Sequence, residues 1–493
     1  MLLMLKKVYI YKSECNYPKS NATFRPDVLY PEYLWATDIS TEKNSVYAAI
    51  RNVLLLAKLD KENIGTSKWN PLKEYVKPGN IVLIKPNLVH EQDKEHVCGE
   101  ALYVQPSIIA AIIDYVIIAL KGTGKIIIGD APVQSCNFPE LIKQSGYDML
   151  VEYYQKKGID ISIRDFRTVI SSFDGNLPIW TYDDSKKESN TYIDLADNSF
   201  FSSLDDDQVK NLRITNYNPD ELKKYHSCHK HEYSITNEVF EADVVINVIK
   251  PKTHRKAGVT LSLKNFVGII SQKECLPHHR NGSVNERGDE YRKKSLLLRA
   301  RAYCLDKKNN NLAMGKNRKA RLFDNAARAF STLSRKISKE NYREGAWYGN
   351  DTIWRMVLDI NNVVQNYLNK DGKRKVLLAF ADMIVAGEND GPLYPSSKKS
   401  GVVAFSDGLV AFDEAITTIM GFDYKLIPVI YNASKYEKLI FGCQTESIII
   451  SNYLPWNEKK CGEIKYKDTL QMDASKNWKG YCELNSQKDK NNG

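Results

Sequence analysis

The 493-residue chain contains no closely spaced pair of cysteines: its nine cysteines are scattered, and no Cys-x-x-Cys motif occurs. Ferredoxin-type clusters and zinc ribbons need thiolates at short spacing, so we expect no iron–sulfur cluster. An odd, unclustered set of cysteines in a chain of this size favours reduced thiols, and therefore a cytoplasmic location.

Long hydrophobic runs are also missing. The apolar start, Met1 to Leu5, is followed at once by two lysines and is too short for the core of a signal peptide. The most apolar stretch, Ile108 to Leu120, is interrupted by Asp114 and is much shorter than a bilayer-spanning helix. We therefore expect a soluble protein with a buried helix at this place.

Several well-known ligand motifs are absent too. Neither a Gly-x-Gly-x-x-Gly fingerprint nor a Gly-x-Ser-x-Gly elbow occurs. The segment Gly122-Thr123-Gly124-Lys125 resembles a phosphate loop only superficially, because Ile126 stands where a hydroxyl is needed and a strand follows the segment instead of preceding it.

The net charge of +10 is concentrated in one segment. Residues 291–344 hold sixteen Lys and Arg against four Asp and Glu. Within them an apolar stripe at helical spacing runs beside arginines repeated every seven residues, which predicts a basic amphipathic helix. Its apolar members are Leu322, Ala326, Phe330, Leu333 and Ile337, and its arginines are Arg321, Arg328 and Arg335. Three explanations stay open: contact with an anionic membrane surface, nucleic-acid binding as the less favoured partner, or a helix packed on its own domain.

Elsewhere, short apolar runs alternate with helical patterns, which predicts an α/β fold with a mostly parallel sheet and helices on both faces. Strands are expected at 81–84, 125–128, 159–166, 243–249, 376–380 and 401–405, and helices at 107–120, 138–155 and 409–420. Residues 171–238 are predicted to be mostly loop. We assign the α/β core to residues 1–270 and 346–455, a basic helical insertion to 271–345, and a partly disordered C-terminal extension to 456–493.

Four of the predicted strands end in polar groups of catalytic or binding type. Ligands of open parallel sheets bind beyond the carboxyl ends of the strands, so these groups are expected to share one pocket, although ordinary loop polarity is the alternative. The catalytic candidates are His254, Lys252 and Asp130; the substrate-binding candidates are Lys85, Asn87, Lys250, Thr253, Lys264 and Asn265. Lysines and a histidine would attract carboxylate or phosphate, and a buried lysine has a lowered pKa. Taken alone, Lys264 would be read as a surface lysine.

Acidic residues raise the possibility of a divalent metal. Asp382, Glu388 and Asp390 could supply hard oxygen ligands, but residues 387–392 also fit a tight turn. A second cluster, His226, Cys228, His229 and His231, has the side chains of a zinc site, yet its irregular surroundings favour a solvated loop.

The motifs together resemble those of the bacterial and archaeal "domain of unknown function" family 362 (DUF362). They are Lys85-Pro86-Asn87, Gly129-Asp130-Ala131-Pro132, residues 242–247, residues 250–254, Leu263-Lys264-Asn265, residues 387–392 and Ala411-Phe412-Asp413, in order from about residue 78 to 425. The resemblance implies an α/β fold and makes the motif residues candidates for a shared site. Some relatives carry iron–sulfur cysteine clusters, which this chain lacks.

The sequence thus favours an enzyme that acts on a small anionic substrate, a carboxylate or a phosphate. Lysines would hold the substrate, and His254 or Asp130 would exchange protons with it. Proton or hydride transfer is the weakly preferred reaction class. A non-catalytic sensor that uses the same pocket is the alternative.

Overall fold

The computed structural model describes residues 6–92, 98–186, 188–217, 219–337, 342–436 and 447–484. Within these ranges, eleven strands form one mixed sheet, and nine of them lie in a single order. That order is β18 (Lys459–Lys460), β17 (Ile448–Ser451), β1 (Lys7–Lys12), β16 (Tyr394–Ser406), β15 (Val376–Asp390), β11 (Val244–Ile249), β2 (Ile81–Pro86), β3 (Lys125–Asp130) and β4 (Ile161–Asp165). The remaining two, β12 (Lys252–His254) and β13 (Gly258–Thr260), form a small hairpin beside β15.

The centre of the sheet is parallel. Strands β4, β3, β2, β11 and β15 all run in one direction, whereas β16 returns antiparallel to both β15 and β1. The prediction of an α/β protein with a mostly parallel sheet is confirmed. The exception arises because β15 and β16 are joined by a short turn, and a turn of that length can connect only antiparallel strands.

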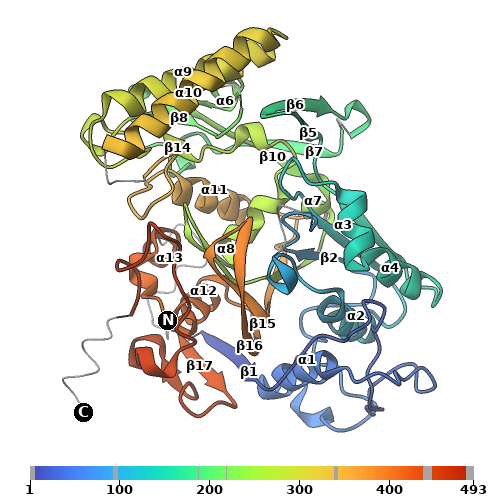
Figure 1. Ribbon diagram of the computed structural model, residues 1–493. Helices are drawn as coiled ribbons and strands as arrows, with labels where there is room; N and C mark the ends of the chain where they lie inside the picture. The colour runs from blue at the N-terminus through green and yellow to red at the C-terminus, as the bar shows by residue number, and fades with distance from the viewer. Residues whose placement is uncertain are drawn as a thin grey trace.

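The two faces of the sheet build two separate cores. Val82 and Ile84 pack with one set of helices, and Leu83 packs with the other, because successive side chains of a strand point to opposite faces. The first set is α1 (Ser45–Leu56), α2 (Pro106–Leu120), α3 (Phe138–Ser145) and α4 (Tyr147–Gln155). The second set includes α8 (Ser262–Asn265), α11 (Ile353–Asn366), α12 (Leu409–Met420) and α13 (Pro428–Lys435) (Figure 1). Because both faces of the central strands are buried, each of these strands appears in the sequence as a continuous run of apolar residues.

Three predicted elements are wrong in detail. The helix expected over 138–155 is two helices, because Gly146 adopts a left-handed conformation (φ 87°) that ends α3 and begins α4. The turn expected over 387–392 starts only at Gly391, since β15 continues to Asp390.

The third concerns residues 171–238, which were expected to be mostly loop. They form or complete several short elements: β5 (Val169–Asp174), β6 (Leu177–Tyr182), β7 (Asn190–Asp194), α5 (Asp206–Lys210), β8 (Leu212–Arg213), α6 (Pro219–Tyr225), β9 (His226–Ser227), β10 (Lys230–Thr236) and α7 (Asn237–Glu241). These strands pair in small sheets that are partly exposed, so their hydrophobic pattern is weak.

The basic segment folds as two packed helices, α9 (Leu296–Ala313) and α10 (Asn317–Ile337), at one end of the molecule (Figure 1). The expected amphipathic helix is present, but it turns a row of small side chains, including Ala320, Ala327 and Ser331, to the protein. Before the helices, Cys275 and Leu276 lie in the core, and β14 (His279–Arg280) pairs with β8 in a separate two-stranded sheet.

No helix in the described part of the chain has both the length and the apolar composition needed to cross a bilayer. At the other end of the chain, Trp456 and Trp478 are buried in the core, so the described part of the C-terminal extension packs on the sheet. The disorder expected after Asn485 concerns residues outside the described ranges.

Candidate functional site

A cavity of about 320 Å³ lies where the sheet changes its winding direction. From β2 the chain proceeds to β3 on one side, and it later returns to β11 on the other side of β2. Loops at the carboxyl ends of such neighbouring strands diverge, which leaves a crevice between them. The polar residues lining it are Asn87, Asp130, Gln134, Thr215, Asn216, Tyr217, His254, Arg255, Lys256, Thr260, Lys264, Asn265, Lys273 and His278.

The lining of this cavity is strongly cationic. Arg255, Lys256, Lys264 and Lys273 all line it, and among the described lining residues Asp130 is the single acid. The carboxylate of Asp130 is already paired with the buried Lys85 ammonium at 2.8 Å. The cavity therefore has excess positive charge, which favours an anionic ligand.

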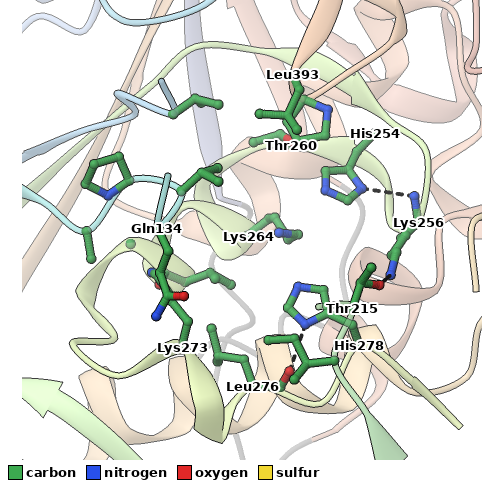
Figure 2. Close-up of a pocket in the computed structure, with 18 of the residues that line it drawn as sticks. Gln134, Thr215, His254, Lys256, Thr260, Lys264, Lys273, Leu276, His278 and Leu393 are labelled. Atoms are coloured by element: carbon green, nitrogen blue, oxygen red, sulfur yellow. Dashed lines mark hydrogen bonds between the residues drawn. The ribbon is translucent and has the colours of Figure 1, made fainter. Parts of the chain in front are cut away.

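Lys264 is the cation best placed to hold such a ligand. It belongs to α8 and lies near the middle of the cavity in Figure 2. No residue that the structure describes pairs with its ammonium group. Burial lowers the pKa of Lys264 to about 8, because the charged form loses hydration that nothing replaces. A bound anion would supply the missing counter-charge.

His254 is held as a neutral hydrogen-bond donor. Its Nδ1 accepts the backbone N–H groups of Lys256 and Ala257, both at 3.0 Å, so the ring proton must be on Nε2. Burial, with the positive charge of Lys264 next in importance, lowers the pKa of His254 well below its usual value. The ring therefore presents Nε2–H to the cavity, which it lines.

His278 is held in the opposite tautomer. Its Nδ1 lies 2.8 Å from the carbonyl oxygen of Leu276, and a carbonyl can only accept, so Nδ1 carries the proton. Burial and the nearby Lys256 lower the pKa of His278 as well. Its Nε2 is then a lone-pair acceptor, and Figure 2 shows both histidines beside Lys264 around the same space.

A buried polar network supports the floor of the cavity. Lys85 donates to Asn265 Oδ1 (3.2 Å), and Asn87 donates to the same oxygen (3.1 Å). Asp130 Oδ2 accepts the backbone N–H of Leu88 at 2.8 Å, which joins the ends of β2 and β3. Burial lowers the pKa of Lys85, although the Asp130 carboxylate opposes that shift. Asn87 Oδ1 is buried and has no hydrogen-bond partner among the described residues.

Gly268 allows the network to pack this closely. A Cβ atom at this position would lie 2.0 Å from Asp130 Oδ1 and 2.6 Å from Lys85 Nζ. The carbonyl of Gly268 also accepts the N–H of Ala131 at 2.7 Å. Any side chain at residue 268 would therefore have to displace the Lys85–Asp130 pair.

Not all of the predicted site residues line this cavity. Lys250 and Asp382 form a second, fully buried ion pair at 3.0 Å, and Tyr17 hydrogen bonds to both. Lys252 donates to the Leu102 carbonyl at 2.5 Å, and burial lowers its pKa to about 7. Thr253 donates to the Asn389 carbonyl. Neighbouring residues of an extended chain point to opposite sides, so Thr253 faces away from the cavity while His254 faces into it.

The predicted metal ligands are spread along one ribbon. Asp382 and Asp390 are eight residues apart on β15, roughly 26 Å at the rise of a strand. Glu388 accepts the backbone N–H of Asp473 at 3.0 Å. Three such separated carboxylates cannot ligate one ion. Within the described ranges, no group of three His, Cys, Asp or Glu side chains is arranged for a metal.

The histidine cluster at 226–231 is partly buried and is not a solvated loop as a whole. His226 and His231 lie in the core with their Nδ1 atoms 3.2 Å apart, and His226 Nε2 donates to the Cys275 carbonyl at 2.8 Å. Cys228 and His229 are exposed. The Nδ1 atoms of the two buried histidines hydrogen bond to each other, so this pair is part of the fold.

Sequence reasoning missed Lys256, Lys273 and His278. Lys273 and His278 lie in the segment assigned to the helical insertion, which was not expected to contribute to the core pocket. Lys256 stands two residues after His254, and that spacing was the only signal that could have pointed to it.

Fold and cavity together define an α/β protein with a cationic cavity at the switch point of a mostly parallel sheet. The chain belongs to the DUF362 family: the model of this family, described as "Domain of unknown function (DUF362)", matches residues 82–196 and 166–418. No curated protein and no solved structure matches the chain.

Proposed function

We propose that this protein is an enzyme acting on a small anionic substrate, a carboxylate or a phosphate, bound in the switch-point cavity. The observation that carries the proposal is the unpartnered Lys264 ammonium among three further cations. A volume of about 320 Å³ suits a small molecule and is at the lower end of ligand pockets, which span about 300–1,000 Å³.

The two histidines supply a proton acceptor and a proton donor. With the anionic group on Lys264, His278 Nε2 would take a proton from the carbon next to it, and the C–H electron pair would move toward the bound carbonyl or carboxylate. His254 Nε2–H would donate a hydrogen bond to the oxygen that gains charge. Asp130 positions Lys85 through their ion pair, and Lys85 in turn donates a hydrogen bond to Asn265. Proton transfer is the step that these side chains can carry out with their own atoms.

Isothermal titration against a panel of carboxylates and phosphorylated sugars tests the binding step. A charge-assisted hydrogen bond is worth about 1.5–3 kcal/mol, so Lys264→Met should weaken the best ligand by about 10- to 100-fold. Lys143→Met, at an exposed lysine on α3, removes the same charge and should change little. Equal affinities of the Lys264→Met variant and the wild type would refute the anion site.

Deuterium exchange tests the chemical step. In D₂O the wild type should exchange the C–H proton next to the anionic group, and His278→Gln should stop exchange while retaining binding within about fivefold. Ligand recovered unchanged and without deuterium would favour the alternative, a binding protein that senses the same anion.

The exposed side of α10 favours a second role, contact with an anionic membrane surface. Leu322 and Ile337 are 69% and 70% exposed, and Leu333 is exposed beside them. The cations Arg318 and Lys336 lie on the same helix. Exposed apolar side chains can insert into a lipid surface. They add nothing to nucleic-acid binding, because the phosphates interact only with the cations.

A charge-adding variant separates these two partners. Leu322→Lys/Ile337→Lys should abolish flotation with phosphatidylserine vesicles because the apolar anchor is lost, whereas the added charge would strengthen nucleic-acid binding. Thr332→Lys, on another side of α10, adds charge without removing an apolar group and should float normally. Flotation of the double variant at the wild-type level would exclude the membrane role.

A further inference from the structure

A second cavity, of about 380 Å³, lies between the β5–β6 hairpin, α6 and the junction of α9 with α10. Its charged lining residues are all acidic: Asp174, Glu221 and Glu274. Three aromatic residues also line it, namely Trp180, Tyr182 and Tyr217. The sign of its charge is therefore opposite to that of the switch-point cavity.

Glu274 is the unsatisfied group in this cavity. It is 4% exposed, and neither oxygen of its carboxylate has a hydrogen-bond partner among the described residues. Tyr182 and Gln134 are uncharged neighbours that interact with this carboxylate and partly oppose the rise in the pKa of Glu274, without meeting the geometry of a full hydrogen bond. Burial raises the pKa of Glu274 to about 7, because no cation stabilises the ionised form.

The other two acids are already neutralised. Asp174 pairs with Arg321 of α10 at 2.6 Å, and Glu221 pairs with Lys224 at 2.7 Å. These four side chains are at least partly exposed, so solvent screens them. Within the described residues, Glu274 is thus the acid of this cavity that lacks a cation.

The aromatic side chains provide the complementary surface. The rings of Trp180 and Tyr217 stack with centroids 6.4 Å apart and an interplanar angle of 28°. The face of an aromatic ring attracts a cation, most strongly for Trp, and the attraction increases when water is excluded. A buried carboxylate beside aromatic faces is the combination that recognises an organic ammonium group.

We propose that this second cavity binds an organic cation, a primary to quaternary amine, whose charge is neutralised by Glu274 and whose alkyl groups rest on Trp180 and Tyr217. The site goes beyond the proposed anion chemistry and does not depend on it. Tyr217 lines both cavities and hydrogen bonds to Gln134, so the two sites share a wall.

The basic helices contribute to the same site. Leu312 and Ala313 at the end of α9, and Asn317 at the start of α10, close one side of the cavity. The Arg321–Asp174 ion pair joins α10 to β5 at this place. The insertion thus completes a pocket that the core alone leaves open.

Titration with choline and with its uncharged isostere 3,3-dimethyl-1-butanol tests the proposal on the full chain. Choline should bind the wild type, and the alcohol should bind at least tenfold more weakly. Glu274→Gln keeps the shape and removes the charge, so it should weaken choline at least tenfold. Trp180→Leu should weaken it about fivefold through loss of the aromatic face.

Two controls make the result specific. Glu62→Gln removes an exposed carboxylate elsewhere and should leave choline affinity unchanged, as should Lys264→Met in the other cavity. Choline binding that persists in Glu274→Gln, or an alcohol that binds as well as choline, would overturn the proposal. Should Glu274→Gln fail to fold, an unchanged affinity in Trp180→Leu would overturn it instead.

Discussion

At the scale of single residues, backbone contacts decide what a side chain can do. His254 and His278 are the same amino acid, yet they have opposite roles. Two backbone N–H groups donate to Nδ1 of His254, so its Nε2 is a donor. A carbonyl accepts from Nδ1 of His278, so its Nε2 is an acceptor. Lys250 is buried and is paired with the Asp382 carboxylate, whereas Lys264 is half-buried and faces the cavity without a described partner. Neither difference is visible in the local sequence.

The lowered pKa of Lys264 predicts a pH dependence. An anion binds to the charged lysine, so affinity for a carboxylate should be highest below pH 7 and fall as pH rises through about 8. Lys264→Arg keeps its charge above pH 12 and should show a shallower fall between pH 7 and 9. Lys256 and Lys273, with pKa values lowered by burial to about 8 and about 7, account for the fall that remains. Parallel profiles for the two proteins in titration calorimetry would contradict the assignment to Lys264.

At the scale of elements, buried ion pairs hold strand ends together. The Lys250–Asp382 pair joins the residue after β11 to β15, and Tyr17 adds the N-terminal segment. The Lys85–Asp130 pair joins β2 to β3. Such pairs act as a unit, because removing one partner leaves an uncompensated charge in a site that water cannot reach.

Asp382→Asn should therefore destabilise the protein by about 3–5 kcal/mol, since Lys250 would stay buried without its counter-charge. The matched control is Asp407→Asn, which breaks a half-exposed pair with Lys6 at 3.8 Å and should cost less than about 1 kcal/mol. Urea unfolding of both variants measures the difference. Similar losses of unfolding free energy in the two variants would show that burial does not determine how much the Lys250–Asp382 pair stabilises the protein.

Gly268→Ala tests the packing around Asp130. The new methyl carbon would lie 2.0 Å from Asp130 Oδ1, so the Lys85–Asp130 pair must separate or the backbone must move. We expect a loss of about 2–4 kcal/mol in the free energy of unfolding, together with weaker anion binding. A variant with wild-type stability and affinity would mean that the Lys85–Asp130 network can rearrange around the new methyl group without loss of stability or binding.

At the scale of the whole molecule, the two cavities carry opposite charge and lie on either side of Tyr217. The sheet supplies the first cavity, at the place where its winding direction reverses. The short elements after β4 and the two basic helices supply the second. The fold therefore decides the charge of each cavity, and the net charge of +10 does not predict it.

A ligand that binds only the folded chain raises its stability. At a concentration about 100 times its Kd, a carboxylate found in the panel should add about 2.7 kcal/mol, measured by thermal or urea unfolding. The same ligand should give no such gain in Lys264→Met. A gain of equal size in that variant would place the anion somewhere other than the switch-point cavity.

The sequence by itself determined the parts of this protein that depend on neighbouring residues. Continuous apolar runs located β2, β3 and β11, and an apolar helical pattern located α12 at 409–420, because burial on both faces leaves an unmistakable local pattern. Of the residues predicted from the polar strand ends and motifs, five line the same cavity: Asn87, Asp130, His254, Lys264 and Asn265.

Only the tertiary structure decided which of those polar groups face each other. It divided the predicted lysines between the cavity and the Asp382 pair, and it separated Glu388 and Asp390 from Asp382 along one strand. It also brought Lys273 and His278 to the cavity from residues 271–345, which had been predicted to be a helical insertion outside the core. Charge composition is a sum along the chain, whereas a binding site depends on distances that only the packing of distant segments can set.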